Sequence, residues 1–271
     1  MRHTLQRGGF TIVEVIIVLA VSSTLIMSGL LIFSGRRQST EFRQASREIQ
    51  SQIEDIINNV TVGYYAKTTD FSCSADSSGS TPTLSTTPTQ QGANLECVFL
   101  GRAVQFNKNW DYYIIYNIVG RRTTGGVFSR AVANMVEAKP ILASISSSQS
   151  SYPETSVQQR LGSFKFGSMK YGTGLSNDSS AVAFISPFPG VIGADITSGS
   201  PVLKMYSASI PEQDQSVFVD WFRANSTGLL ETPQVEICFD SQSTDQSFYV
   251  TIGGSNQQTT TSSRIDAGAC S

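Results

Sequence analysis

Charged side chains are scarce in this sequence. They make up 15% of its 271 residues, whereas about a quarter is usual in soluble domains. The formal net charge is −2, from 19 Lys and Arg against 21 Asp and Glu, so there is no basic excess. Because Lys and Arg that neutralise phosphates drive binding to nucleic acid, nucleic acid is not the default partner of this chain.

Histidine is almost absent as well, since His3 is the only one. A chain that lost its first residues would have none, which excludes Ser-His-Asp and Cys-His nucleophile systems and zinc sites that contain histidine. There is also no Walker loop and no complete EF-hand loop. We therefore expect no enzyme, metal site or cofactor, although two single carboxylates that meet in the fold could still form a glycosidase-like pair.

Cysteine is limited to four residues, without a C-x-x-C pair. That pattern argues against a redox motif or a zinc knuckle. An even count after an N-terminal hydrophobic segment favours an exported protein with two disulfides. Of the three possible pairings we favour the sequence neighbours, Cys73 with Cys97 and Cys238 with Cys270. Each bridge would contribute roughly 3–4 kcal/mol through loop entropy.

What the sequence does have is a long apolar run near its start. Phe10 to Phe33 contains a single charge, Glu14. A helix of that length spans about 36 Å, which is enough to cross a hydrocarbon core of ~30 Å. The run is too long for an ordinary secretory signal. A plain membrane anchor fits the length but gives no reason for Glu14, because a carboxylate at that depth costs about 2.5–3.5 kcal/mol and is usually paired.

The residues around Glu14 resemble a known signal. The stretch Gly8-Gly9-Phe10-Thr11-Ile12-Val13-Glu14-Val15 is similar to the type III signal of type IV prepilins and pseudopilins. The resemblance implies that a membrane-embedded prepilin peptidase cleaves after Gly9 and methylates the new amine of Phe10. It also implies that Glu14 pairs with the N-terminal amine of a neighbouring subunit during filament assembly.

The apolar helix is expected to continue as an amphipathic one. In residues 38–60 the apolar side chains recur at steps of three and four residues, which draws one stripe along a helix: Phe42, Ala45, Ile49, Ile53, Ile56 and Val60. We expect this stripe to pack on the protein's own sheet rather than on a separate partner.

The rest of the chain favours β-structure. Alternating or apolar runs predict seven strands: Leu95–Phe106, Tyr112–Val119, Ser163–Tyr171, Ala181–Ile185, Val217–Phe222, Gln234–Phe239 and Ser247–Ile252. At most short helices are expected at Phe128–Ala138 and Ser156–Leu161. Residues 74–94 have the composition of a loop.

These elements predict an α+β fold in which a long N-terminal helix packs on a mainly antiparallel β head, as in pilins. The expected division is a leader at 1–9, a transmembrane and filament-core helix at 10–35, an amphipathic half at 36–62 and a β-rich head at 63–271. Two stretches of the head, Gly101–Phe106 and Ile237–Cys270, resemble the minor pseudopilin H and related minor pilins.

The expected function is therefore that of a minor pilin or pseudopilin in a type IV pilus or a type II secretion-like pseudopilus. Its expected partners are other pilin subunits, the prepilin peptidase and the membrane assembly platform. The expected location is a single pass in the cytoplasmic (inner) membrane with the head exported, followed by an extracellular or periplasmic filament.

Two alternatives stay open. An adhesive or DNA-binding tip pilin would use a ligand site on the head, and Arg121, Arg122 and Arg130 form the head's only basic cluster. A solvated hairpin tip is the simpler interpretation of that cluster. The other alternative is a membrane-anchored enzyme.

Overall fold

The computed structural model of the chain describes residues 11–63, 72–76, 79–85, 96–143, 156–188, 203–210, 214–254 and 260–270. At 29–39, 72, 85, 156 and 157 it describes the backbone alone. The chain divides into two compact units, Met1–Gln44 and Ala45–Ser271.

The elements follow one another in this order: α1 (Ile12–Thr61), β1 (Ser72–Ser74), β2 (Thr83–Ser85), β3 (Cys97–Gln105), β4 (Tyr112–Arg121), α2 (Met135–Ala138), β5 (Ile141–Leu142), β6 (Ser156–Arg160), β7 (Phe164–Tyr171), β8 (Asn177–Ser179), β9 (Ala181–Ile185), β10 (Lys204–Ser207), α4 (Gln215–Asn225), the 3₁₀ turn η2 (Ser226–Gly228), β11 (Leu230–Thr232), β12 (Gln234–Ser241), β13 (Gln246–Gly253) and β14 (Thr261–Ala267).

The second unit is built from two main antiparallel sheets and a small β1–β2 ribbon. One sheet has the order β11-β10-β9-β3-β4-β5, with β6 also paired to β4, and the other has the order β14-β13-β12-β7-β8. Aromatic side chains join the two sheets: the Phe106 ring lies 5.1 Å from Phe166 of β7 and 5.8 Å from Phe239 of β12. All three rings are buried, so this contact between the sheets belongs to the unit's core.

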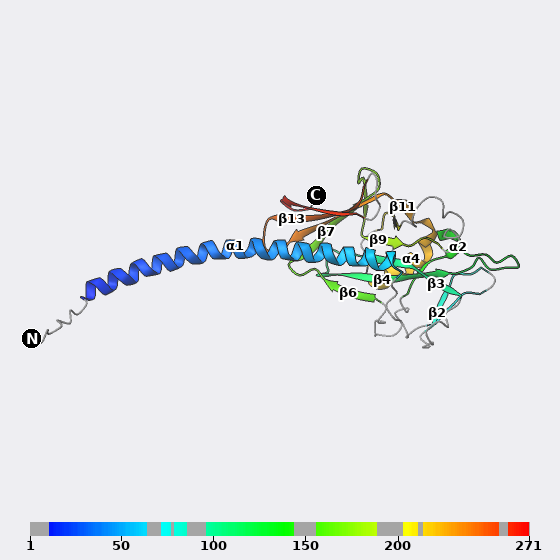
Figure 1. The fold of residues 1–271 in the computed structure, drawn as a ribbon, viewed down its shortest axis with the longest axis horizontal. Coiled ribbons are helices and arrows are strands. Elements are labelled where there is room, and N and C mark those ends of the chain that lie inside the picture. Colours follow the sequence, from blue (N-terminus) through cyan, green and yellow to red (C-terminus); the bar gives the residue numbers. More distant parts are fainter. Residues whose placement is uncertain are drawn as a thin grey trace, which may run out of the picture. The chain divides into compact units, whose positions relative to one another are not determined.

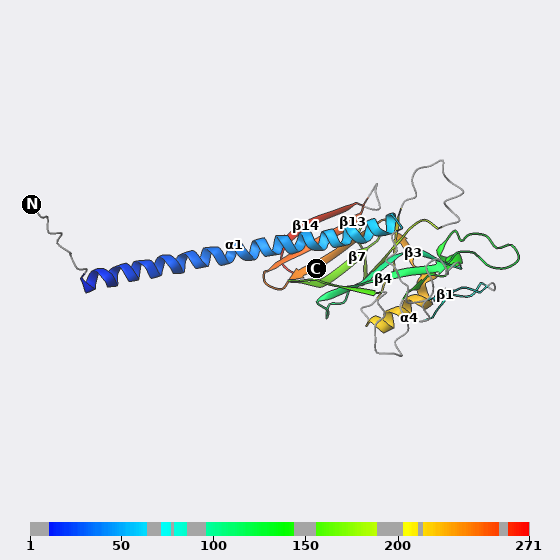
Figure 2. The same cartoon turned by 60° about the horizontal axis from the view of Figure 1, so that its bottom comes forward.

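Strand β4 is buried on both of its faces because a helix covers each side of its sheet. The Tyr116 ring of β4 packs 5.5 Å from Phe218 of α4. The alternate residue Tyr113 points the other way and donates a hydrogen bond to Gln52 of α1 at 2.9 Å. Figure 2 shows β3 and β4 between α1 and α4. Such two-sided burial explains the nearly continuous apolar run of this strand.

Helix α1 also contacts the second sheet. Within the second unit, Ser263 of β14 donates to Gln50 at 2.8 Å, and Thr261 donates to Glu54. The predicted stripe faces inward, because Ile49, Ile53, Ile56 and Val60 are all buried. From Ala45 onward, the expectation that the stripe packs on the protein's own sheet is therefore confirmed (Figure 1).

Two predicted elements are wrong. Residues 217–222 form part of helix α4 rather than a strand, because Phe218 and Phe222 are four residues apart and lie on the single helix face that packs on the sheet. Residues 156–160 form strand β6 rather than a short helix, paired with β4 from Tyr116↔Ser156 to Tyr112↔Arg160.

The predicted fold class is corrected too. The described part of the chain is mostly β-sheet, its helices other than α1 are short, and the chain is divided into two units rather than forming one body in which an anchor helix becomes the spine of a β head. Among the described residues, no helix is both long enough and apolar enough to cross a membrane.

That finding also contradicts the predicted single pass through the inner membrane. The prediction relied on the length of the apolar run at 10–35. Within that run, Glu14 and the hydroxyl residues at 22–24 and 28 interrupt the apolar character of the helix.

Candidate functional site

The N-terminal segment of α1 exposes apolar side chains on every side of the helix. Every residue from Thr11 to Ser28 is exposed. Its large apolar members are Ile12, Val13, Val15, Ile16, Ile17, Val18, Leu19, Val21, Leu25, Ile26 and Met27, each at least 47% exposed. We call residues 12–28 the apolar segment. Exposed apolar surface that is continuous in this way marks an interaction site.

Three of the four hydroxyl groups of the apolar segment bond back to the helix itself. Ser28 Oγ donates to the carbonyl of Thr24 at 2.7 Å, and Thr24 Oγ1 donates to that of Val21 at 2.8 Å. Ser23 donates in the same way to Leu19. Because these three donors are satisfied inside the helix, they do not need a hydrogen-bond partner when the segment packs against another apolar surface.

Glu14 is the only charged residue of the apolar segment, and it forms a capping box with Thr11. The Thr11 backbone N–H donates to Glu14 Oε2 at 2.9 Å, and the Thr11 hydroxyl donates to the same oxygen at 3.0 Å. In return, the Glu14 N–H donates to Thr11 Oγ1 at 3.3 Å. These reciprocal bonds satisfy donors at the helix start that no carbonyl of a preceding turn can reach.

The capping box also keeps Glu14 ionised. The backbone bond from Thr11 is the main cause of a lowered Glu14 pKa, the Thr11 hydroxyl is the second, and both outweigh desolvation, since the carboxylate is open to solvent. The apolar segment therefore carries one fixed negative charge near its N-terminal end. A surface that buried this charge would need to supply a cation, because an unpaired buried carboxylate is costly.

The other predicted site residues are distributed over the chain. The predicted cleavage and methylation positions, Gly9 and Phe10, lie outside the described residues. Both favoured disulfides are confirmed in the second unit. Cys73 of β1 is bonded to Cys97 of β3, with 6.0 Å between their Cα atoms, and Cys238 of β12 is bonded to Cys270, at 5.8 Å.

The predicted basic cluster does not form a phosphate-binding patch. Arg121 is 2% exposed, and its guanidinium donates to the carbonyls of Asp76 and Ser80 at 2.8 and 3.2 Å. Arg130 is paired with Glu137. Only Arg122 of the three is exposed without an ion-pair partner in the described part of the chain. The simpler interpretation, a solvated hairpin, fits this arrangement better than DNA capture.

One group of residues has the composition of a metal site but not its chemistry. Cys238, Asp240 and Cys270 lie together, yet both sulfurs are in the disulfide and neither is a thiolate. Asp240 accepts a hydrogen bond from the Cys270 backbone N–H at 2.7 Å. Its role here is to hold the C-terminal end of the chain.

Sequence reasoning missed the capping box, although its signal was present. Thr11-x-x-Glu14 is the S/T-x-x-E pattern that marks a helix start. The carboxylate was interpreted only as a group that awaits another subunit. The structure gives it a partner within its own chain.

Comparisons of the chain with protein-family models, with curated proteins and with solved structures found no match. Interpretation of the candidate site therefore depends on its own residues.

Proposed function

We propose that this chain is a subunit of a type IV pilin-like or pseudopilin-like filament, and that it enters the filament through the apolar segment of α1. The observation that carries this proposal is the exposure of eleven large apolar side chains around one ionised carboxylate. A helix that is apolar all round is stabilised when another surface removes its side chains from water. A bundle of such helices from several subunits is a surface of that kind.

The role proposed for Glu14 is to select the register of the neighbouring subunit. Covering the apolar segment removes water from the carboxylate, so only a neighbour that places a cation beside it avoids the cost of an unpaired charge. The resemblance of residues 8–15 to the prepilin signal suggests that this cation is the methylated amine of Phe10, released when the peptidase cleaves after Gly9.

The first experiment is mass spectrometry of the N-terminal peptide and of the intact protein, recovered from cells that produce it naturally. A chain that begins at N-methylated Phe10 is expected. A mature chain that begins elsewhere would overturn the processing step, and with it the cation proposed for Glu14.

The assembly step is tested by substitutions in the apolar segment. Leu19, which is exposed, is changed in Leu19→Asp, and the matched control is Val217→Asp on the exposed side of α4. We expect the first to abolish recovery of the chain in sheared filaments and the second to leave it unchanged. Both should change the free energy of unfolding by less than about 0.5 kcal/mol, since neither site is buried.

Glu14→Gln separates the two roles of the carboxylate. Glutamine still accepts the bonds of a capping box, but it has no charge to pair with a cation. We expect the helix start to be kept and incorporation into filaments to fall at least about tenfold. Normal incorporation of this variant would contradict the proposed pairing.

A further inference from the structure

The loop between β4 and α2 holds two apolar side chains almost completely in solvent. Val127 is 94% and Phe128 92% exposed, and we call this pair the Val127–Phe128 apex. The loop extends beyond the ends of β3 and β4 (Figure 1). Placing a phenyl ring at the tip of a loop forfeits the free energy of burying it. Apart from the half-buried Phe99, the second unit buries its other described phenylalanines with side chains in the core, so the apex is an exception within this unit.

The loop beneath the apex is held by backbone pairing. Thr123 and Ala131 form a β-bridge, and the Thr124 N–H donates to the Arg130 carbonyl at 2.8 Å. Gly125 and Gly126 both have positive φ, of 75° and 83°, which glycine tolerates and a residue with a Cβ rarely does. These features define a tight turn that projects the next two side chains outward.

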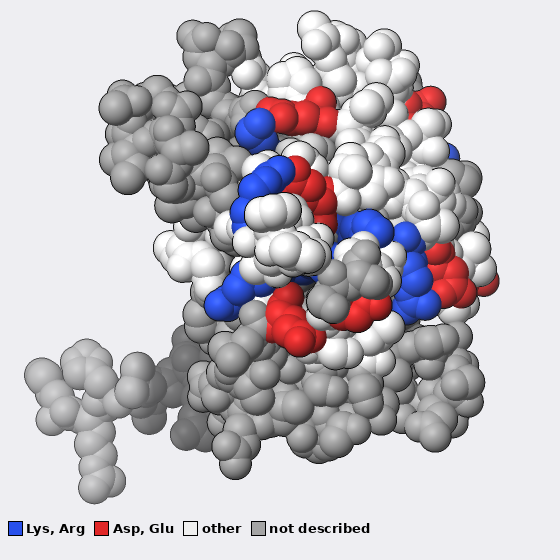
Figure 3. All heavy atoms as spheres, turned by 90° about the vertical axis from the view of Figure 1, so that its right-hand side faces the viewer, with Lys and Arg blue, Asp and Glu red and all other residues white. Residues whose placement is uncertain are grey.

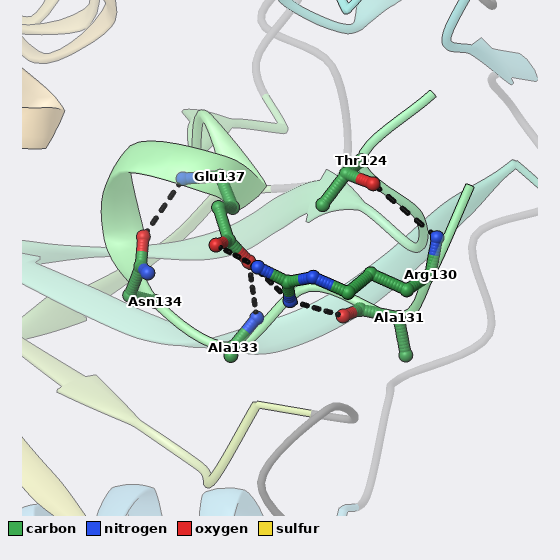
Figure 4. Close-up of polar contacts among 6 residues, drawn as sticks. All are labelled: Thr124, Arg130, Ala131, Ala133, Asn134 and Glu137. Carbon is green, nitrogen blue, oxygen red and sulfur yellow. Dashed lines mark hydrogen bonds and ion pairs between the residues drawn. The ribbon is translucent and has the colours of Figure 1, made fainter. Parts of the chain in front are cut away.

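The base of the loop is clamped by Glu137. Its carboxylate accepts from the two terminal guanidinium nitrogens of Arg130, at 3.1 and 2.5 Å, and from the Ala133 N–H at 2.8 Å. Asn134 caps the same short helix by accepting the Glu137 N–H at 2.9 Å. Figure 4 shows Arg130 and Glu137 facing each other across the loop. The base of the loop is therefore held in place before any partner arrives, which lowers the entropy cost of binding at the apex.

The charges around the apex argue against a lipid surface as its partner. Anionic membranes attract protein surfaces that have an excess of Lys and Arg. Here Arg130 is paired with Glu137, the backbone of Arg122 is bonded to that of Glu96, and Figure 3 shows both signs interspersed on this end of the unit. An apolar centre surrounded by charges of both signs is the anatomy of a protein-binding hot spot.

The shape of the apex argues against a symmetric contact with a second copy. An aromatic side chain buries about 150–250 Å², whereas a stable symmetric dimer needs about 1,200 Å² or more in total. Two convex apices that met at a two-fold axis would cover too little surface. A convex apex is complementary to a concave surface instead.

We propose that the Val127–Phe128 apex inserts into an apolar pocket of a second, different protein, whose rim places a carboxylate opposite Arg122. The side chain of Arg122 is exposed and has no ion-pair partner in the described part of the chain, so it is free to accept one from the partner. This docking surface is separate from the apolar segment of α1 and does not depend on the filament proposal.

The test places a photoreactive benzoyl-phenylalanine at position 128 of the full chain, in cells that produce the protein naturally. The matched control carries the same group at Val217, another exposed apolar position of the second unit. Irradiation should give one discrete protein adduct from position 128 and none from 217. The cross-linked protein is then purified, and its affinity for the full chain is measured directly.

In that measurement, the double change Val127→Ser and Phe128→Ser should weaken binding at least about 30-fold, as loss of a hot spot does. Arg122→Glu should weaken it at least about fivefold, while Arg223→Glu, a charge reversal at an exposed position of α4, should not.

Adducts only with lipid, or with a second copy of this chain, would overturn the proposal. The proposal would also be overturned by equal labelling from positions 128 and 217, by the absence of any adduct, or by an affinity that the apex substitutions do not change. Leu19→Asp should leave the adduct intact, which separates failure here from failure of the filament proposal.

Discussion

The apolar segment of α1 and the C-terminal part of the same helix contain similar apolar residues, but the first exposes them and the second buries them. Residues 12–28 expose isoleucine, valine and leucine on all sides, whereas Ile49, Ile53, Ile56 and Val60 are at most 2% exposed within the second unit. The difference lies in the polar residues between the apolar ones. Charges interrupt residues 41–55 and leave one stripe, which a sheet of the same chain can cover. The apolar segment has no such polar face, so covering it requires surfaces on more than one side.

The comparison teaches that the hydrophobicity of a residue does not by itself determine whether the residue stabilises the folded chain. Apolar residues stabilise the folded chain only where the chain itself removes them from water. Elsewhere they are available for assembly. Substitutions in the two regions should therefore separate into effects on unfolding and effects on association.

The largest expected effect comes from the core of the second unit. Phe239 is fully buried and contacts the rings of Phe106 and Phe248. Phe239→Ala should lower the free energy of unfolding by about 3–5 kcal/mol through lost burial and the cavity left behind. Leu25→Ala in the apolar segment should lower it by less than about 0.5 kcal/mol.

Chemical denaturation of both variants, followed by circular dichroism, measures this contrast. Should Phe239→Ala fail to fold, Phe239→Leu offers a milder step at the same site. Comparable losses at positions 239 and 25 would break the comparison, because the apolar segment would then be covered within the chain.

Much of the local structure could be predicted because it depends on short-range patterns. A continuous helix was expected over residues 10–62, as an apolar half and an amphipathic half, and α1 begins at Ile12 and ends at Thr61. Both disulfides join sequence neighbours, as favoured, since each closes a loop of moderate length.

The errors lie where tertiary contacts override local pattern. The short, mainly apolar run 217–222 fits both the two-residue period of a strand and the 3.6-residue period of a helix. Its packing against β4 makes it a helix. Strand β14 is mostly polar and almost wholly exposed, with Ile265 as its one large apolar residue, and was not predicted at all. It is a strand because it pairs with β13 along its whole length. The predicted fold class failed at a larger scale, because neither the membrane span nor the division into units follows from hydropathy along the run.

A smaller effect is expected where α1 meets β4. The buried hydroxyl of Tyr113 donates to Gln52, so Tyr113→Phe leaves an acceptor unsatisfied and should cost about 1 kcal/mol. Burial is the main cause of a Tyr113 pKa well above its usual range, and the nearby Asp55 and Glu48 charges add to it. A raised pKa stabilises the folded chain below the phenol's ordinary pKa, and this stabilisation is lost as pH rises above it.

Tyr113→Phe should therefore lose less stability than the unmodified chain between about pH 8 and about pH 11, measured by denaturation at each pH. Gln52→Ala removes the acceptor of the same hydrogen bond but keeps the phenol, so it serves as the control for the hydrogen bond alone. Parallel pH profiles for the unmodified chain and Tyr113→Phe would show that the phenol is solvated.

The smallest effect is expected at the start of the apolar segment, and it decides whether Glu14 acts within its own chain. The Thr11 bonds lower the Glu14 pKa, so the cap is complete above the carboxyl's ordinary pKa and is lost as pH falls through the lowered one. Amide hydrogen exchange at residues 12–15 should accelerate, relative to its intrinsic rate, over that acidic range.

Thr11→Ala should remove about 1 kcal/mol of local helix stability and raise the Glu14 pKa. In Glu14→Gln the protection should not vary with pH in this range. If neither substitution changed the exchange protection of residues 12–15, the capping box would not hold the helix start. The carboxylate of Glu14 would then act only through its partner in the assembly.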